Sequence, residues 1–467
     1  MKKFLAILMT LVIVLSLCAC AGAGDKKDVG LQVGFGMVDI TPDFSVGMGG
    51  LSETVTRKSQ GVVSKIYLTC IAFKEGDETV LMYTVDMINA ADHVREKMRE
   101  AATKGTGVPA EKIFIGTTHT HSAPYYGMSD VPGAKFNTLF LNAVENAGKT
   151  AMEDLAPATM LMSKMNVEGM NFVRHYIMSD GSIAGSNFGT MTGLTAVGHP
   201  APTEPELLLL KFDRADDKKD ILMVNWQGHP ASPYSEEIGY LNISADYVGA
   251  MRDKLIKETG MNVAYFTGAE GNLGPNSEVP SEKHGLGVKA YGQKMADYAL
   301  EALNNLAPVE GTGIQSTQIS YTLKVNHEGE DRLADAKRVR ELENTSNIND
   351  ARKLAAQLGF SSYYEAAGIV NRSSLGETKQ MEMNAIRIGG IGFVAGTYEM
   401  FSEASLYIRE HSPYAATFVI TANMGYIASE AAFDYKSYGA VTCTFVKGTS
   451  EELAEKFVEL LNGLKAE

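Results

Sequence analysis

The sequence holds only four cysteines in 467 residues, and none of them forms a Cys-x-x-Cys pair. This scarcity argues against a sulfur-ligated metal site and against a cysteine nucleophile. Cys70 and Cys443 lie in apolar runs, where cysteines are usually buried thiols. One disulfide between these two residues would also fit an oxidising compartment, so the sequence leaves both states open.

Positive charge is also scarce. Lysine and arginine total 42 against 56 aspartates and glutamates, which gives a net charge of −14. A negatively charged surface repels nucleic acid and has no cluster of basic residues that would bind anionic lipid. We therefore expect no nucleic-acid partner. With 45 % hydrophobic residues, the chain can still build a large core.

An apolar run stands at the N-terminus. Two lysines precede the run over residues 4–17, which has the form of a secretory signal and is short for a transmembrane helix. The Leu-Cys-Ala-Cys segment at residues 17–20 resembles the lipobox of bacterial lipoproteins, which implies cleavage before Cys20 and lipid on its sulfur. The alternative is an ordinary signal peptide that is cut after Ala21 or Ala23.

This interpretation divides the chain into a signal peptide (residues 1–19), a flexible tether (20–30) and one catalytic domain (31–467). A lipid anchor on Cys20 would place the protein in the cell envelope, on the outer surface of a bacterial membrane. Membrane contact would then come through the anchor only. With an ordinary signal, the protein would be secreted.

Apolar segments of strand and helix period alternate along the mature chain. This order is typical of an α/β fold, with mixed β-sheets covered by helices. Residues 330–366 are charged and mainly helical, and we expect a solvated hairpin there.

Polar clusters follow four of the predicted strands. They are His119 after residues 113–118, His229 after 221–226, the segment 268–272 after 263–267, and Glu399 after 391–395, at the start of a predicted helix. In open α/β sheets, ligands bind at the carboxyl ends of strands. We therefore expect these clusters to converge.

The Thr-His-Thr-His segment at residues 118–121 is the most informative of these clusters. In an extended chain, residues two apart face the same side, so His119 and His121 would project together. Imidazole is a common zinc ligand and titrates near working pH. The pair indicates a metal or catalytic site, although a polar loop is the ordinary alternative.

The other candidate residues each have an ordinary structural role as well. His229 could cap a helix or lie in the core, and Glu399 could complement a helix dipole. Tyr426 could be a strand aromatic. Arg174 could be a surface cation or could anchor a substrate oxygen. Asp86 could orient a metal-binding histidine by accepting a hydrogen bond from its ring, or it could merely end its strand.

Taken together, these segments resemble the neutral/alkaline ceramidase family of zinc amidases. The matching motifs run in order through nearly all of the mature chain: 33–42, 118–122, 225–230, 243–246, 271–276, Glu399 with Phe401, and 426–427. The resemblance implies a zinc ion held by His119, His229, Glu399 and Tyr426, with Tyr438 as a competitor for Tyr426. It places His121 on the substrate side as a proton donor, and it gives Arg174 a contact with substrate. Tyr426 or His121 would stabilise the oxyanion.

The implied reaction is metal-assisted hydrolysis of the amide of an N-acylated lipid such as ceramide, which gives a fatty acid and a sphingoid base. Two features depart from the family pattern. Gly274 stands where the family has a serine, and the match ends without the family's C-terminal β-sandwich. The alternatives are a zinc hydrolase of another acylated amine or ester, cell-wall or glycan derived, and a surface lipoprotein that binds a ligand without catalysis.

Overall fold

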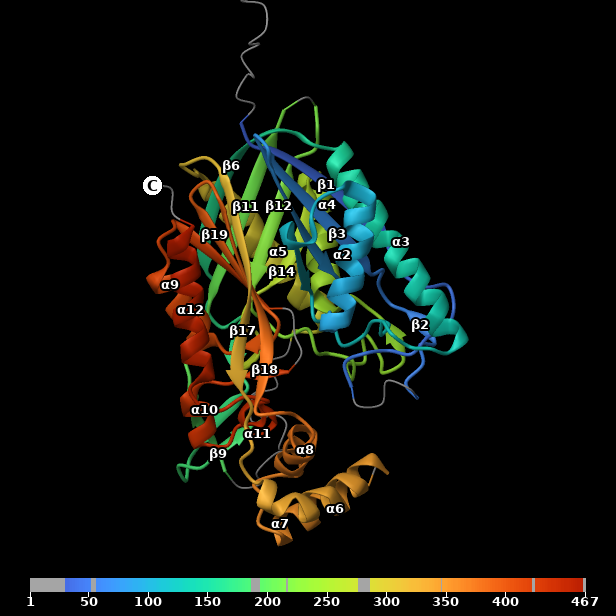
Figure 1. Cartoon of the computed structure of the whole chain (residues 1–467), viewed down its shortest axis with the longest axis vertical. Helices are drawn as coiled ribbons and strands as arrows, with labels where there is room; N and C mark the ends of the chain where they lie inside the picture. The colour runs from blue at the N-terminus through green and yellow to red at the C-terminus, as the bar shows by residue number, and fades with distance from the viewer. Residues whose placement is uncertain are drawn as a thin grey trace, which may run out of the picture.

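The fold is built from four layers, in which two β-sheets pack face to face between outer helices (Figure 1). The computed structural model describes residues 30–51, 56–185, 194–215, 217–275, 286–345, 347–421 and 425–464. The predicted signal peptide, Cys20 and nearly all of the predicted tether lie outside these residues. Within them, no helix combines the length and apolar character that a membrane span requires.

The first sheet is large and mixed. Its strands lie in the order β14-β12-β11-β6-β1-β3-β4-β5, and β16 also pairs with β6. The strands are β1 (Gln32–Asp39), β3 (Tyr67–Glu75), β4 (Glu78–Val85), β5 (Ile113–Thr117), β6 (Ala156–Asn166), β11 (Glu206–Arg214), β12 (Ile221–Trp226), β14 (Asn262–Thr267) and β16 (Ala307–Pro308).

Alternating side chains of the first sheet enter different cores. Cys70 of β3 packs beneath the outer helices, whereas its neighbour Ile71 faces the second sheet. This alternation follows from the two-residue repeat of a strand. The outer helices are α2 (Asp92–Thr106), α3 (Val131–Glu153), α4 (Asp246–Thr259) and α5 (Val288–Ala302).

The second sheet has the order β17-β18-β19-β21. These strands are β17 (Ile314–Lys324), β18 (Thr378–Ile388), β19 (Ile391–Gly396) and β21 (Ala416–Thr421). One face packs on the first sheet, and the other is covered by α9 (Ser402–His411) and α12 (Thr449–Gly463). The predicted α/β architecture with mixed sheets is therefore confirmed.

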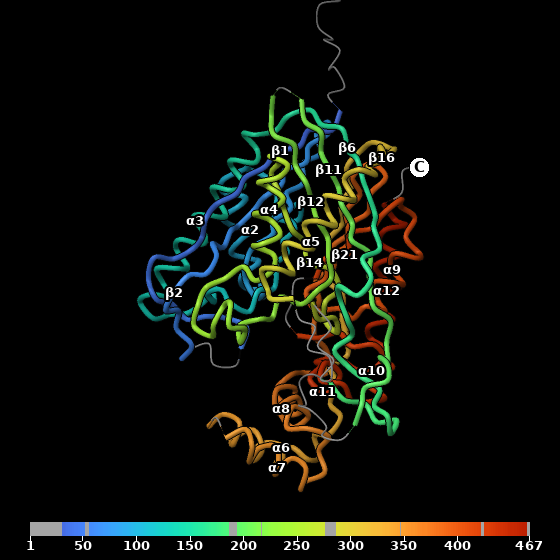
Figure 2. Tube along the Cα trace, turned by 180° about the vertical axis from the view of Figure 1, so that it is seen from behind, coloured from blue at the N-terminus to red at the C-terminus, as the bar shows by residue number. Residues whose placement is uncertain are grey.

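Residues 333–372 form α6 (Leu333–Asn344), α7 (Ile348–Gln357) and α8 (Tyr363–Arg372). The expected two-helix hairpin is wrong in form, because these three helices share a small core of their own around Val339, Ala355 and Phe360. In both views α6 and α7 extend beyond the ends of the sheets (Figure 2). Helix α8 lies against the short helix α11 (Tyr438–Thr442).

Small paired segments complete the described chain. They are β2 (Gly61–Val62) with β13 (Asn242–Ile243), β7 (Asn171–Val173) with β15 (Leu273–Pro275), β8 (His175–Met178) with β9 (Ile183–Gly185) and β10 (Ala196–Gly198), and β20 (Glu399–Met400) with β22 (Tyr426–Ile427). Helix α10 (Glu430–Asp434) precedes α11. Cys70 and Cys443 are both free and buried, in different cores. The disulfide that the sequence left open is absent between these two described residues.

Candidate metal and substrate site

Side-chain hydrogen bonds tie together the strand ends that carry the site. Thr267, at the end of β14, donates from Oγ1 to the carbonyl of Thr118 at 3.0 Å. The buried Asn225 of β12 donates from Nδ2 to the carbonyls of Phe266 (2.8 Å) and Val419 (3.2 Å). The ends of β5, β12, β14 and β21 are thereby held at one edge, where the sequence predicted that the polar clusters would meet.

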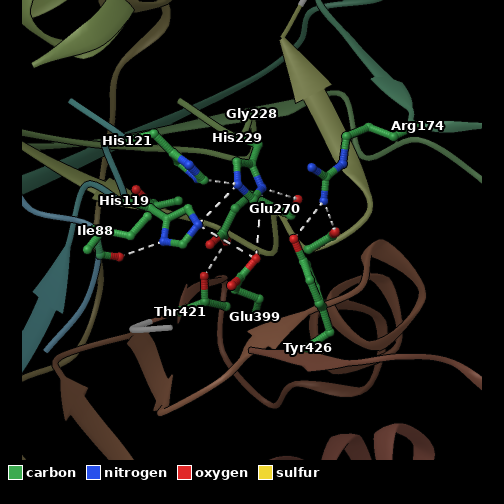
Figure 3. A network of polar contacts seen from close by, with 12 residues as sticks. Ile88, His119, His121, Arg174, Gly228, His229, Glu270, Glu399, Thr421 and Tyr426 are labelled. Atoms are coloured by element: carbon green, nitrogen blue, oxygen red, sulfur yellow. Dashed lines mark hydrogen bonds and ion pairs between the residues drawn. The ribbon is translucent and has the colours of Figure 1, made fainter. Parts of the chain in front are cut away.

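His119 is fixed by its backbone and by its ring. Its φ of 64° is uncommon for a residue other than glycine, and such conformations often occur at functional sites. Its Nδ1 lies 2.7 Å from the carbonyl oxygen of Ile88, so Nδ1 carries the proton and Nε2 is left as a free lone pair. Nε2 lies 3.1 Å from Nε2 of His229 (Figure 3). This tautomer is suited to ligate a metal through Nε2.

His121 also reaches the cluster, although the chain there is not extended as we expected. Strand β5 ends at Thr117, and the left-handed turn at His119 redirects the backbone. His121 is held by its own backbone, which donates to the carbonyl of Pro230 at 3.1 Å and accepts from Nη1 of Arg57 at 2.8 Å. Its Nε2 lies 2.9 Å from Nε2 of His229. His121 therefore reaches the other histidines through tertiary contacts, and not because alternate residues of a strand face the same side.

Two buried carboxyl groups complete the cluster. Glu399 Oε2 lies 3.6 Å from His119 Nε2 and 3.9 Å from His229 Nδ1. Glu399 is in β20, and α9 begins only at Ser402, so the expected helix start at Glu399 is wrong and the alternative helix-dipole role does not apply. Glu270 lies just after β14 and accepts a short hydrogen bond from the Thr421 hydroxyl.

Glu270 was not singled out as a site residue from the sequence. Only its place in a glycine-rich segment after a strand could have pointed to it. The two potential metal-binding groups among the described residues are His119 with His121 and His229, and His119 with Glu270 and Glu399. Within each group the donor atoms lie within 4.8 Å of one another.

The electrostatics of the cluster suit a bound cation. Burial, with the positive charge of Arg174, lowers the pKa of His229 well below its ordinary value and that of His121 to about 3. Burial lowers the pKa of His119 in the same way. Burial raises the pKa of both carboxyl groups, and the charge of Glu399 raises that of Glu270 further.

Neutral imidazoles are the form that binds metals. Glu399 Oε2 is buried without a hydrogen-bond partner, a gap that a cation would fill. The nitrogen and oxygen donors present therefore fit zinc.

Arg174 and Tyr426 lie together at one side of the cluster (Figure 3). Nη2 of Arg174 donates to the carbonyl of Gly271 and lies 3.4 Å from the Tyr426 hydroxyl. The Tyr438 ring is 5.4 Å from the Tyr426 ring and 4.6 Å from the Tyr364 ring. The structure thus brings Arg174, Tyr426 and Tyr438 to the same site, with Tyr426 in direct contact with Arg174.

A cavity of about 850 Å³ opens beside the cluster. Its lining includes His121, His229, Arg174, Tyr426 and Tyr438, so the cavity gives a small molecule direct access to the imidazoles and the guanidinium. This volume is in the range of small-molecule sites. Other described lining residues are Tyr234, Glu236, Glu237, Asp246 and Gly274.

Two residues that the sequence suggested for special roles lie outside the cluster. Asp86 forms an ion pair with Arg252 at 2.8 Å and accepts from the backbone of Tyr67, so the suggestion that it orients a histidine is wrong. Gly274 lies in β15, where a Cβ would come within 2.9 Å of two Phe172 ring carbons. A serine at this position would require that ring to move.

Comparisons with known proteins support the fold. No protein-family model and no curated protein matches the sequence. Among solved structures, neutral ceramidase from Pseudomonas aeruginosa matches with a TM-score of 0.67 and 17 % identity, over 94 % of this chain and 76 % of that chain. A ceramidase complexed with C2 matches with a TM-score of 0.68 and 15 % identity, over 94 % and 75 %. The chain therefore has the neutral ceramidase fold that the sequence resemblance implied.

Proposed function

We propose that this chain, which has the neutral ceramidase fold, is a zinc-dependent amidohydrolase that cleaves an N-acylated lipid such as ceramide. The observation that carries the proposal is the buried cluster of His119, His229 and Glu399, in which each side chain lies within 4 Å of the other two, beside a cavity of about 850 Å³. The fold likeness to two ceramidases supports the substrate class. A binding protein without catalysis would have no need for buried, neutral imidazoles next to unpartnered carboxylate oxygens.

We assign the metal ligands as His119, His229 and Glu399, with Tyr426 as the further donor that the family resemblance implies. A zinc ion held there supplies Lewis-acid activation of the hydrolytic water. The Ile88 carbonyl keeps the proton of His119 on Nδ1, which holds the ring in its ligand orientation.

The residues that face the cavity would act on the substrate. Arg174 presents a guanidinium to the substrate oxygen and is held in place by the Gly271 carbonyl. His121 lines the cavity, and its neutral imidazole could accept a proton from the hydrolytic water and pass that proton on to the leaving amine. Tyr426 could donate a hydrogen bond from its hydroxyl to the developing oxyanion.

The decisive experiment measures fatty-acid release from ceramide by the purified protein, before and after removal of metal with a chelator. We expect release that is lost with the chelator and restored by zinc. Release that persists in metal-free protein would refute the metal assignment. No release from protein shown to hold zinc would refute ceramide as the substrate.

One observation favours a second substrate class. Glu236, Glu237 and Asp246 line the cavity, and Gly274 stands where the family has a serine. An acidic wall suits a substrate whose amine part is polar or cationic. The same hydrolysis would then act on another acylated amine, and a panel of N-acyl amines and esters tested beside ceramide would identify it.

We further propose that Cys20 carries lipid and holds the protein at the outer surface of a bacterial membrane. The support is the lipobox-like segment at residues 17–20. Expression in a bacterium with radiolabelled fatty acid should label the wild-type protein and leave Cys20→Ala unlabelled. Equal labelling of both would refute the anchor.

A further inference from the structure

Glu270 is a buried carboxyl group that nothing in the proposed mechanism uses. The residue is fully buried, and its Oε2 accepts from Thr421. Its Oε1 has no hydrogen-bond partner among the described residues. Leaving a carboxylate oxygen buried and unsatisfied is costly, so a partner for Oε1 is to be expected.

A second carboxyl group of the cluster also has an unsatisfied oxygen. Glu399 Oε2 is also buried without a hydrogen-bond partner. One donor atom from each of Glu270, Glu399 and His119 lies within 4.8 Å of the others. Donors that bind zinc at about 2.0–2.2 Å can be up to about 4.4 Å apart, so small side-chain rotations would bring all three onto one ion.

His119 limits the cluster to one ion. It belongs to both potential groups, the one with two histidines and the one with two glutamates. Because its Nδ1 is bound to the Ile88 carbonyl, only Nε2 can coordinate, and one nitrogen lone pair serves one metal. Besides the two glutamates, His229 is the histidine nearest to this ion, because its Nε2 lies 3.1 Å from His119 Nε2 and its Nδ1 lies 3.9 Å from Glu399 Oε2. His121 lines the cavity and is left for the substrate side.

We propose that Glu270 is a direct ligand of the same metal ion and adds a second carboxylate to His119, His229, Glu399 and Tyr426. This inference rests on the metal centre of the proposed function and extends it. Two carboxylates neutralise the charge of a divalent cation inside the protein. Thr421 holds one oxygen of Glu270 and leaves the other for the metal, which is how protein ligands are commonly oriented.

The test compares zinc affinity and cobalt spectra of purified metal-free proteins. Glu270→Gln removes the charge and keeps the shape, and Glu403→Gln is the matched control. Glu403 accepts hydrogen bonds from Asn272 (3.1 Å) and Ser429 (2.8 Å) near the cluster but forms no contact with the three histidines in the described structure. We expect Glu270→Gln to weaken the zinc Kd by about 100-fold and to change the visible spectrum of bound Co²⁺. Glu403→Gln should stay within about twofold of wild type.

An unchanged Kd and an unchanged cobalt spectrum in Glu270→Gln would overturn the proposal. If that variant does not fold, as judged by circular dichroism, Glu270→Asp replaces it. Aspartate keeps the charge but withdraws the carboxylate, and the same loss of affinity is expected.

A His119→Ala variant distinguishes a failure of the Glu270 assignment from a failure of the whole proposed metal centre. If His119→Ala loses zinc while Glu270→Gln keeps it, only the role of Glu270 falls. If His119→Ala keeps zinc with wild-type affinity, the whole metal centre is wrong.

Discussion

Replacing Asn225 with leucine should damage both stability and the metal site. The side chain is fully buried, donates to two carbonyls and accepts from Nη2 of Arg409 at 2.7 Å. Leucine has a similar size but leaves two carbonyls and a guanidinium donor unsatisfied. A neutral hydrogen bond contributes about 0.5–1.5 kcal/mol and one to a charged group about 1.5–3 kcal/mol. We therefore expect Asn225→Leu to lower the free energy of unfolding by about 3–5 kcal/mol.

The same substitution should weaken zinc binding, because the lost bonds tie together the ends of β12, β14 and β21. These ends precede His229 and Glu270 and carry Thr421. Displacing a ligand support commonly costs about 10–100-fold in metal affinity, and we expect a zinc Kd weakened by at least about tenfold.

The assay is urea unfolding of metal-free protein, followed by fluorescence. Trp226 is the only tryptophan of the chain, is fully buried and adjoins Asn225, so its emission reports on this region. Asn462→Leu is the control. Asn462 makes one exposed hydrogen bond on α12, and its loss should change stability by less than about 0.5 kcal/mol. A loss below about 1 kcal/mol in Asn225→Leu, with unchanged zinc affinity, would refute the reasoning.

Three further predictions concern single side chains. Burial lowers the pKa of His175 to about 3, so this residue is neutral when folded and protonated below about pH 6.5 when unfolded. The free energy of unfolding should therefore fall as the pH drops from 7 to 5. This fall should be about 2 kcal/mol smaller in His175→Phe than in wild type, and an equal fall in both proteins would contradict the prediction. Gly274→Ser should crowd Phe172, lower stability by about 1–3 kcal/mol and give no gain in turnover, so a stable and faster variant would contradict the packing argument. Arg174→Lys loses the planar guanidinium that reaches the Gly271 carbonyl and the Tyr426 hydroxyl. We expect KM to rise about tenfold with the zinc content unchanged. An unchanged KM would show that Arg174 does not contact the substrate.

Local patterns in the sequence were enough to predict the α/β class and to single out most residues of the candidate cluster. Short continuous apolar runs marked strands β5, β12 and β14, because these strands are buried on both faces. Histidines after such strands were informative because ligands bind at the carboxyl ends of strands in α/β sheets. The strands β5 and β12 are not neighbours in the sheet, and hydrogen bonds from Thr267 and Asn225 help to bring their ends together. The paired strands β6 to β10 were not predicted, since several are short and only partly buried.

The sequence by itself determined the α/β class, the candidate residues His119, His121, His229, Glu399, Arg174 and Tyr426, and the family resemblance that links them. These are properties of residue type, order and local period, which are present in the chain before it folds. The tertiary structure decided that Glu270 joins the cluster and that Asp86 does not. It also decided that His121 reaches His229 through a left-handed turn at His119. Such outcomes depend on which distant strand ends meet and on which oxygens remain buried without partners, and no local pattern encodes either.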